Sequence, residues 1–220
     1  MPTVPTTPQL PAAVPASQQM ILDAFQSESL VKTLTDVQHT PLYDSVTIAA
    51  YNSGSPGSGV VNNLTTAFFT NVGPASGKSL ALTNCSQSQR LPTGEMISVL
   101  AFRFRIGETI LRADLDTLMD TQALQFWMNK KSYQLGPLWY YSAGGGIWGQ
   151  SNTNNQSTWT NGIPGREAMH KLAIPIVIES GATFYGELIG TAQVLTEDTL
   201  GGLGAFLQLV MDGLYARMVN

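Results

Sequence analysis

Hydrophobic and polar residues alternate with a period of two in many segments of this chain, and that spacing is typical of half-buried β-strands. In residues 96–106, the alternation places Leu100 and Phe102 on a core face and Val99 and Arg103 on the opposite face. The segments predicted to be strands are residues 44–51, 64–70, 78–84, 96–106, 123–129, 168–179, 182–195 and 205–219.

Helical spacing occurs in two places. In residues 108–121, Leu111, Leu115 and Leu118 form one apolar stripe, which predicts an amphipathic helix. A partly helical spacing also follows Ser17, a residue suited to a helix N-cap, and extends to about residue 37. We therefore expect an all-β protein with one or two short helices.

The N-terminal segment differs in composition from the rest of the chain. It carries Pro2, Pro5, Pro8, Pro11 and Pro15, and proline disfavours both helices and central strands. We interpret residues 1–37 as an extended N-terminal arm that contains the possible short helix. Residues 38–220 are then expected to form a single domain, since a chain of 220 residues is long enough to bury one large β core.

Charge is scarce in this chain. Only 12% of the residues are charged, and the formal net charge is −4, which argues against a protein that grips phosphate backbones. We therefore expect no sequence-specific binding of nucleic acid. A polar but uncharged surface can be buried against copies of itself without a large ionic desolvation cost. This composition fits a subunit with many neighbours, and it also fits a neutral extracellular β-domain.

Residues 132–165 contain no charged side chain and are predicted to form a long loop. Such a loop is usually functional, and uncharged aromatic residues are typical of protein interfaces and of sugar-binding surfaces. The alternative is that these aromatics cap one end of the domain's own core. The candidate residues for a subunit interface or a ligand surface are Trp139, Tyr140, Tyr141, Trp148 and Trp159.

Patterns of catalytic and metal-binding residues are weak. The chain has one cysteine, Cys85, and two histidines, His39 and His170, which do not make a ligand set for zinc. No nucleophile motif accompanies either histidine. We therefore predict no enzymatic activity, no cofactor and no metal, although a pair of carboxylates from distant segments remains open at this level.

Three segments carry a resemblance to a known family. Residues 91–95, Leu-Pro-Thr-Gly-Glu, lead into the strand predicted at 96–106. Residues 173–178, Ala-Ile-Pro-Ile-Val-Ile, precede a tight turn and a second strand. Residues 207–217 form a long closing strand. In this order the chain resembles the jelly-roll coat proteins of icosahedral, tailless DNA bacteriophages, the vertical jelly-roll lineage, and is most similar in length to those of membrane-containing phages.

This resemblance implies a jelly-roll sandwich of two antiparallel sheets with about eight strands. It also implies a structural capsid protein that self-assembles, through its loops, sheet faces and arm, into an icosahedral shell around a genome. The expected partners are copies of the chain and other capsid proteins, with an internal membrane as a further candidate, and the expected location is the virion after synthesis in the host cytoplasm. The alternative function is a carbohydrate-binding or receptor-binding β-sandwich module that uses the loop 132–165.

Overall fold

The computed structural model describes residues 34–48, 60–61, 67–107, 110–142, 146–149, 171–194 and 205–218. Most of these residues lie in antiparallel strands, and they include one α-helix, α2 (Arg112–Thr121). The expectation of an all-β protein with two antiparallel sheets is confirmed. Most of the proposed arm, residues 1–33, lies outside the described residues.

The first sheet is built around the C-terminal strand β11 (Ala205–Met218). One edge of β11 pairs with β5 (Glu95–Ile106), which pairs in turn with β8 (Ile176–Glu179). The other edge of β11 pairs with two strands placed end to end, β1 (Leu34–His39) and β2 (Leu42–Ile48). Because β1 begins at residue 34, the helical segment that we predicted after Ser17 does not extend to residue 37.

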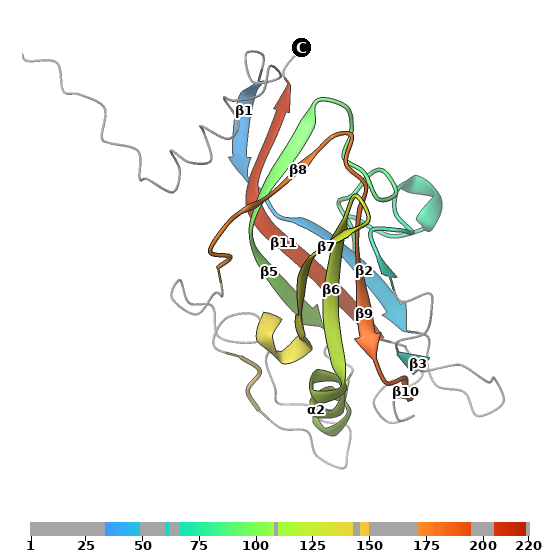
Figure 1. Cartoon of the computed structure of the whole chain (residues 1–220). Coiled ribbons are helices and arrows are strands. Elements are labelled where there is room, and N and C mark those ends of the chain that lie inside the picture. Colours follow the sequence, from blue (N-terminus) through green and yellow to red (C-terminus); the bar gives the residue numbers. More distant parts are fainter. Residues whose placement is uncertain are drawn as a thin grey trace, which may run out of the picture.

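The second sheet has the strand order β4-β9-β6-β7. Its members are β4 (Ala67–Phe68), β9 (Phe184–Gly190), β6 (Gln122–Met128) and β7 (Lys131–Pro137). A separate pair joins β3 (Val60–Val61) to β10 (Gln193–Val194). In Figure 1, β6 crosses over β11, so the two larger sheets form two layers.

The strand pairing is nested along the chain. The first strands, β1 and β2, pair with the last strand, β11; β4 pairs with β9; β5 pairs with β8; and β6 pairs with β7. The described chain is therefore a long antiparallel ribbon folded back on itself. Two further pairings, β11 with β5 and β9 with β6, join the arms of this ribbon into the two sheets.

The hydrophobic core lies between the two sheets. Phe102 of β5 meets Phe126 of β6 with ring centroids 5.1 Å apart, and Phe104 meets Phe68 of β4 at 5.8 Å. All four rings are almost completely buried. The sheets pack closely at Gly186 of β9, where a Cβ atom would lie 2.7 Å from Leu209 Cδ2 of β11.

A β-bulge changes the alternation that we predicted for β5. Val99 pairs with Gly213 and Ala101 pairs with Asp212, so Leu100 has no partner on β11. The extra residue reverses the faces on one side of the bulge. Val99 therefore belongs to the main core, whereas Leu100 packs outside it against a small cluster around Met96 and Ala216.

Several predicted boundaries differ from the structure. In their described parts, the strands predicted at 168–179 and 64–70 are shortened to β8 and β4. Residues 78–84 form turns rather than a strand, and the Asn84 side chain and backbone bond the edge of β2 at Tyr43. The predicted loop 132–165 begins with strand β7, which pairs with β6 through residue 137. The strand predicted at 182–195 is divided into β9 and β10, with a break after Gly190 at φ 155°.

Candidate interaction surface

Three of the five aromatic residues predicted from sequence, Trp139, Tyr140 and Tyr141, lie in a short 3-10 helix, η3 (Leu138–Tyr141). In a 3-10 helix, residues three apart lie on the same face. Leu138 and Tyr141 are accordingly buried, with 0% and 2% of their surface exposed. Trp139 and Tyr140 between them are 58% and 36% exposed.

Tyr141 is therefore a core residue and not part of the surface that we predicted. Its ring packs against Phe102 with centroids 6.3 Å apart, and burial raises the pKa of its hydroxyl. For this residue the alternative expectation, an aromatic that caps the core, is the one that fits. Trp159 lies outside the described residues.

Trp148 is exposed on a segment that is tied to helix α2. The Arg112 side chain, in the first turn of that helix, donates hydrogen bonds to the carbonyl oxygens of Ile147 and Gly149 at 3.3 and 3.0 Å. These two bonds fix the backbone on both sides of Trp148, whose side chain is 61% exposed. Trp139, Tyr140 and Trp148 thus present aromatic surface to solvent from anchored positions.

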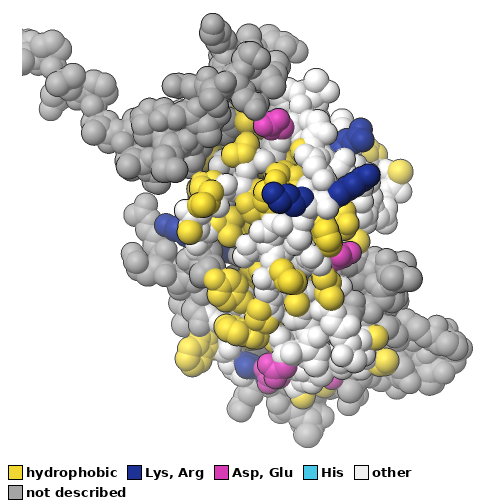
Figure 2. All heavy atoms as spheres, in the orientation of Figure 1, with side chains coloured by type: hydrophobic (Ala, Val, Ile, Leu, Met, Phe, Trp, Pro, Cys, Tyr) yellow, Lys and Arg dark blue, Asp and Glu magenta, His cyan; other side chains and the backbone are white. Residues whose placement is uncertain are grey.

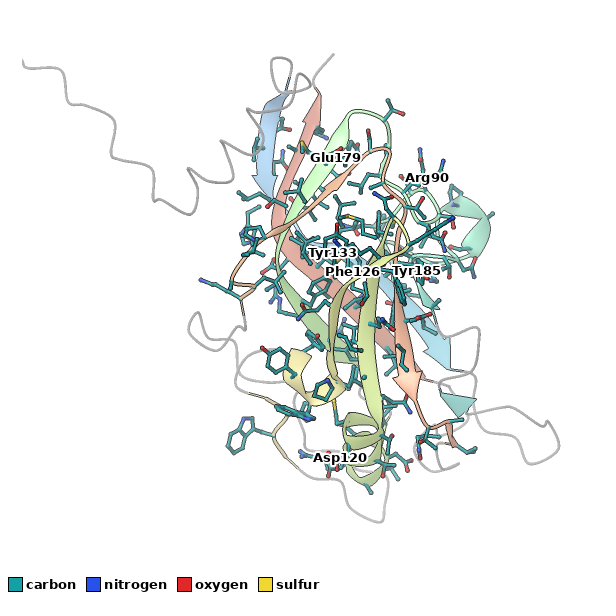
Figure 3. The ribbon with its side chains drawn as sticks, in the orientation of Figure 1. Arg90, Asp120, Phe126, Tyr133, Glu179 and Tyr185 are labelled. Carbon is teal, nitrogen blue, oxygen red and sulfur yellow. The ribbon has the colours of Figure 1, made fainter. Side chains whose placement is uncertain are left out.

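A second aromatic surface, which we did not predict, covers the outer face of the sheet β4-β9-β6-β7. Trp127 of β6 and Tyr185 of β9 are directly opposite each other in the register. Their rings are nearly parallel, with an interplanar angle of 15° and centroids 6.2 Å apart. Figure 3 shows Tyr133 on β7 and Tyr185 on β9, the strands that flank β6.

Hydrogen bonds order this second surface. Trp127 Nε1 donates to Glu187 Oε1 at 2.8 Å, and Gln125 Nε2 donates to Ser132 Oγ at 3.0 Å. Desolvation and the nearby Glu187 carboxylate both raise the pKa of Tyr185. In Figure 2, hydrophobic side chains lie on this face among uncharged polar atoms and few charged groups.

A polar cavity of about 260 Å³ lies at one end of the first sheet. Its polar groups pair with one another: Arg217 Nη2 lies 2.9 Å from Asp36 Oδ2, and the Tyr215 hydroxyl donates to a Glu95 oxygen. Burial and the Glu95 carboxylate together raise the pKa of Tyr215. Because its lining groups satisfy one another, this cavity is better explained as a structural network than as a reaction centre.

Among the described residues, a further small cluster of titratable groups lies at Asp212, whose carboxylate oxygens are 3.3 Å from His39 Nε2 and 2.9 Å from Arg103 Nη2. No group of three or more His, Cys, Asp or Glu side chains suited to a metal ion occurs in the parts of the chain that the structure describes. No helix in these parts has the length and hydropathy to cross a membrane. No family model and no curated protein sequence matches this chain.

Proposed function

We propose that this chain is a structural coat subunit of an icosahedral, tailless bacteriophage and that its domain is a jelly roll. The nested strand pairing is the observation that carries the proposal. A jelly roll is a double sheet of eight strands made by folding an antiparallel ribbon. With β1 and β2 taken as one strand interrupted at Thr40 and Pro41, the two larger sheets contain eight strands in the pairing that such folding requires.

The surface chemistry supports a role in assembly. Trp139, Tyr140 and Trp148 expose aromatic rings beside an uncharged segment, and Trp and Tyr are the residues that contribute most strongly to protein interfaces. Exposed aromatic side chains on a monomer leave apolar surface in water, which favours association with a neighbouring subunit. In a shell, each copy would bury these rings against the next, and the N-terminal arm would add further contacts.

The proposal is tested by measuring the assembly of the purified full-length chain. We expect electron microscopy and sedimentation velocity to show capsomers or closed particles. Trp139→Ser should shift the population to slowly sedimenting species, because it removes an exposed aromatic contact and leaves the core intact. Leu80→Ser is the matched control, since Leu80 is 80% exposed and lies far along the chain from η3.

Two results would overturn the proposal. The first is a full-length chain that remains strictly monomeric at high concentration and across a range of salt. The second is a full-length chain that forms particles, but particles that neither Trp139→Ser nor Leu80→Ser changes. A monomer that binds glycans through Trp139, Tyr140 and Trp148 would instead favour the carbohydrate-binding or receptor-binding module.

A further inference from the structure

The outer face of the second sheet contains a groove of about 410 Å³ at the end of the β6–β7 hairpin. This volume is within the range of small-molecule sites in proteins, about 300–1,000 Å³. We propose that the groove binds a pyranose sugar ring, stacked against Trp127 and Tyr185. This site is separate from η3, and the proposal does not depend on the coat function. The groove is lined by Trp127, Asn129, Lys130, Thr183 and Tyr185.

The pair of aromatic side chains that lines the groove is pre-organised. Trp127 and Tyr185 come from neighbouring strands, and their nearly parallel rings are both partly exposed. The bond from Trp127 Nε1 to Glu187 holds the indole in one orientation. The C–H face of a pyranose is apolar and flat, so it can pack on such rings with little loss of side-chain entropy.

The rim of the groove offers the hydrogen-bonding groups that sugar hydroxyls need. Asn129 Oδ1 accepts a bond from the Thr183 backbone N–H at 3.0 Å, which fixes the amide and directs its Nδ2 donors elsewhere. Among the described residues, the structure shows no hydrogen bond to Asn129 Nδ2, Lys130 Nζ or the Tyr185 hydroxyl. Vicinal hydroxyls each donate and accept, and this rim supplies donors together with the Tyr185 and Thr183 oxygens.

The backbone of the hairpin turn determines where the Lys130 side chain lies at the groove. Asn129 and Lys130 both have positive φ, 49° and 67°, in a two-residue turn that favours glycine at its second position. A lysine in the left-handed region costs about 1 kcal/mol relative to glycine. The turn thus places a lysine, at this cost, at the edge of the groove, where its side chain can contact a ligand.

The experiment uses the full-length protein and three probes: methyl α-glucopyranoside, methyl β-galactopyranoside and methyl N-acetyl-β-glucosaminide. Binding is measured by saturation-transfer NMR and by calorimetry. We expect at least one glycoside to bind with Kd in the range of roughly 0.1–10 mM. Cyclohexanol, a ring of the same size with a single hydroxyl, should bind at least about tenfold more weakly, because it cannot satisfy the polar rim.

Variants locate the binding on the protein. Trp127→Ala and Tyr185→Ala should each weaken the affinity about tenfold or more, whereas Trp139→Ala, on η3, should leave it unchanged. Lys130→Gly removes one rim donor and relieves the positive-φ strain. It should lower the affinity severalfold while leaving thermal stability equal or higher, which separates a loss of ligand contact from a loss of folding.

Three results would overturn the sugar site. They are the absence of binding by all three glycosides at about 20 mM, equal binding of cyclohexanol, and an affinity unchanged by both Tyr185→Ala and Lys130→Gly. The coat function is scored separately by particle formation. If the chain assembles but binds no glycoside, the coat function is supported and the sugar site is refuted. If it stays monomeric but binds a glycoside, the sugar site is supported and the coat function is refuted.

Discussion

The buried ion pair between Asp44 and Lys78 ties the segment after β4 to strand β2. Asp44 is fully buried, and its Oδ1 lies 2.8 Å from Lys78 Nζ. Its Oδ2 accepts a 2.7 Å hydrogen bond from the backbone N–H of Phe69, which has the unfavourable φ of 65°. One carboxylate thus neutralises a nearly buried ammonium group and holds a core residue in a left-handed conformation.

We expect Lys78→Met to be strongly destabilising. It leaves the Asp44 carboxylate buried without a countercharge, and removing one partner of a buried pair costs about 3–5 kcal/mol. For a chain of this size, 1 kcal/mol corresponds to roughly 2–4 °C, so the melting temperature should fall by roughly 6–20 °C. That loss is a large part of the about 5–15 kcal/mol by which a typical domain is stable.

A second variant tests the cause of the loss. Asp44→Asn combined with Lys78→Met buries no charge, and the amide oxygen can still accept from Phe69, so most of the stability should return. The control is Asp116→Asn, which breaks an exposed pair with Arg112 and should cost less than about 0.5 kcal/mol. Chemical unfolding followed by circular dichroism measures all three. A double variant as unstable as Lys78→Met would show that lost packing, not an unpaired charge, causes the effect.

Two further predictions concern Gly213 and Cys85. A Cβ atom on Gly213 would lie 2.0 Å from the carbonyl oxygen of Ser98, so Gly213→Ala should destabilise the fold by about 3 kcal/mol or more. The control is Gly181→Ala, because a Cβ atom there has nothing within 4 Å. In the same unfolding assay it should change the stability by less than about 0.5 kcal/mol. Burial raises the pKa of the Cys85 thiol from 9.0 to about 11, so iodoacetamide at pH 8 should modify the native protein far more slowly than the urea-unfolded chain. Equal labelling rates in the native and unfolded states would contradict the burial of this thiol. Because the pKa is higher in the folded state, the thiol's contribution to stability is complete below pH 9 and declines between pH 9 and 11.

The strands that could be predicted from the sequence are those in which large apolar residues alternate over many positions. β5, β6 and β11 are of this kind, and none of their predicted bounds differs from the observed one by more than one residue. The bulge at Leu100 was not predictable from alternation. It depends on the partner strand, where Gly213 permits an approach to Ser98 that no other residue would allow.

Strand β7 was missed because it is an edge strand with mostly exposed side chains. Its residues include Gly136 and Pro137, which disfavour strands, and it forms because the turn at Asn129 and Lys130 folds it back onto β6. The opposite error occurred at residues 78–84, where apolar residues indicated a strand. There the edge of β2 is bonded by the Asn84 side chain instead of a regular ladder.

The candidate surfaces were partly predictable for a similar reason. Uncharged aromatic composition identified Trp139, Tyr140 and Trp148, but only the three-residue spacing of η3 separates them from the buried Tyr141. The pairing of Trp127 with a tyrosine fifty-eight residues later is a consequence of the β6–β9 register. That pairing cannot be read from either strand alone, because alternation says which face a residue occupies and not which residue lies beside it.

Several charged side chains among the described residues pair with one another within the molecule. Asp44 bonds Lys78, Asp212 bonds Arg103 at 2.9 Å, and Asp36 bonds Arg217. Each pair joins segments that are distant in sequence, so these charges fix the arrangement of the strands instead of remaining available to a partner. Much of the remaining exposed surface consists of aromatic and uncharged polar groups, whose burial between neighbours would carry no ionic desolvation cost. Low charge and exposed aromatic rings are therefore two parts of one surface chemistry, and both support the proposal that copies of this chain contact one another.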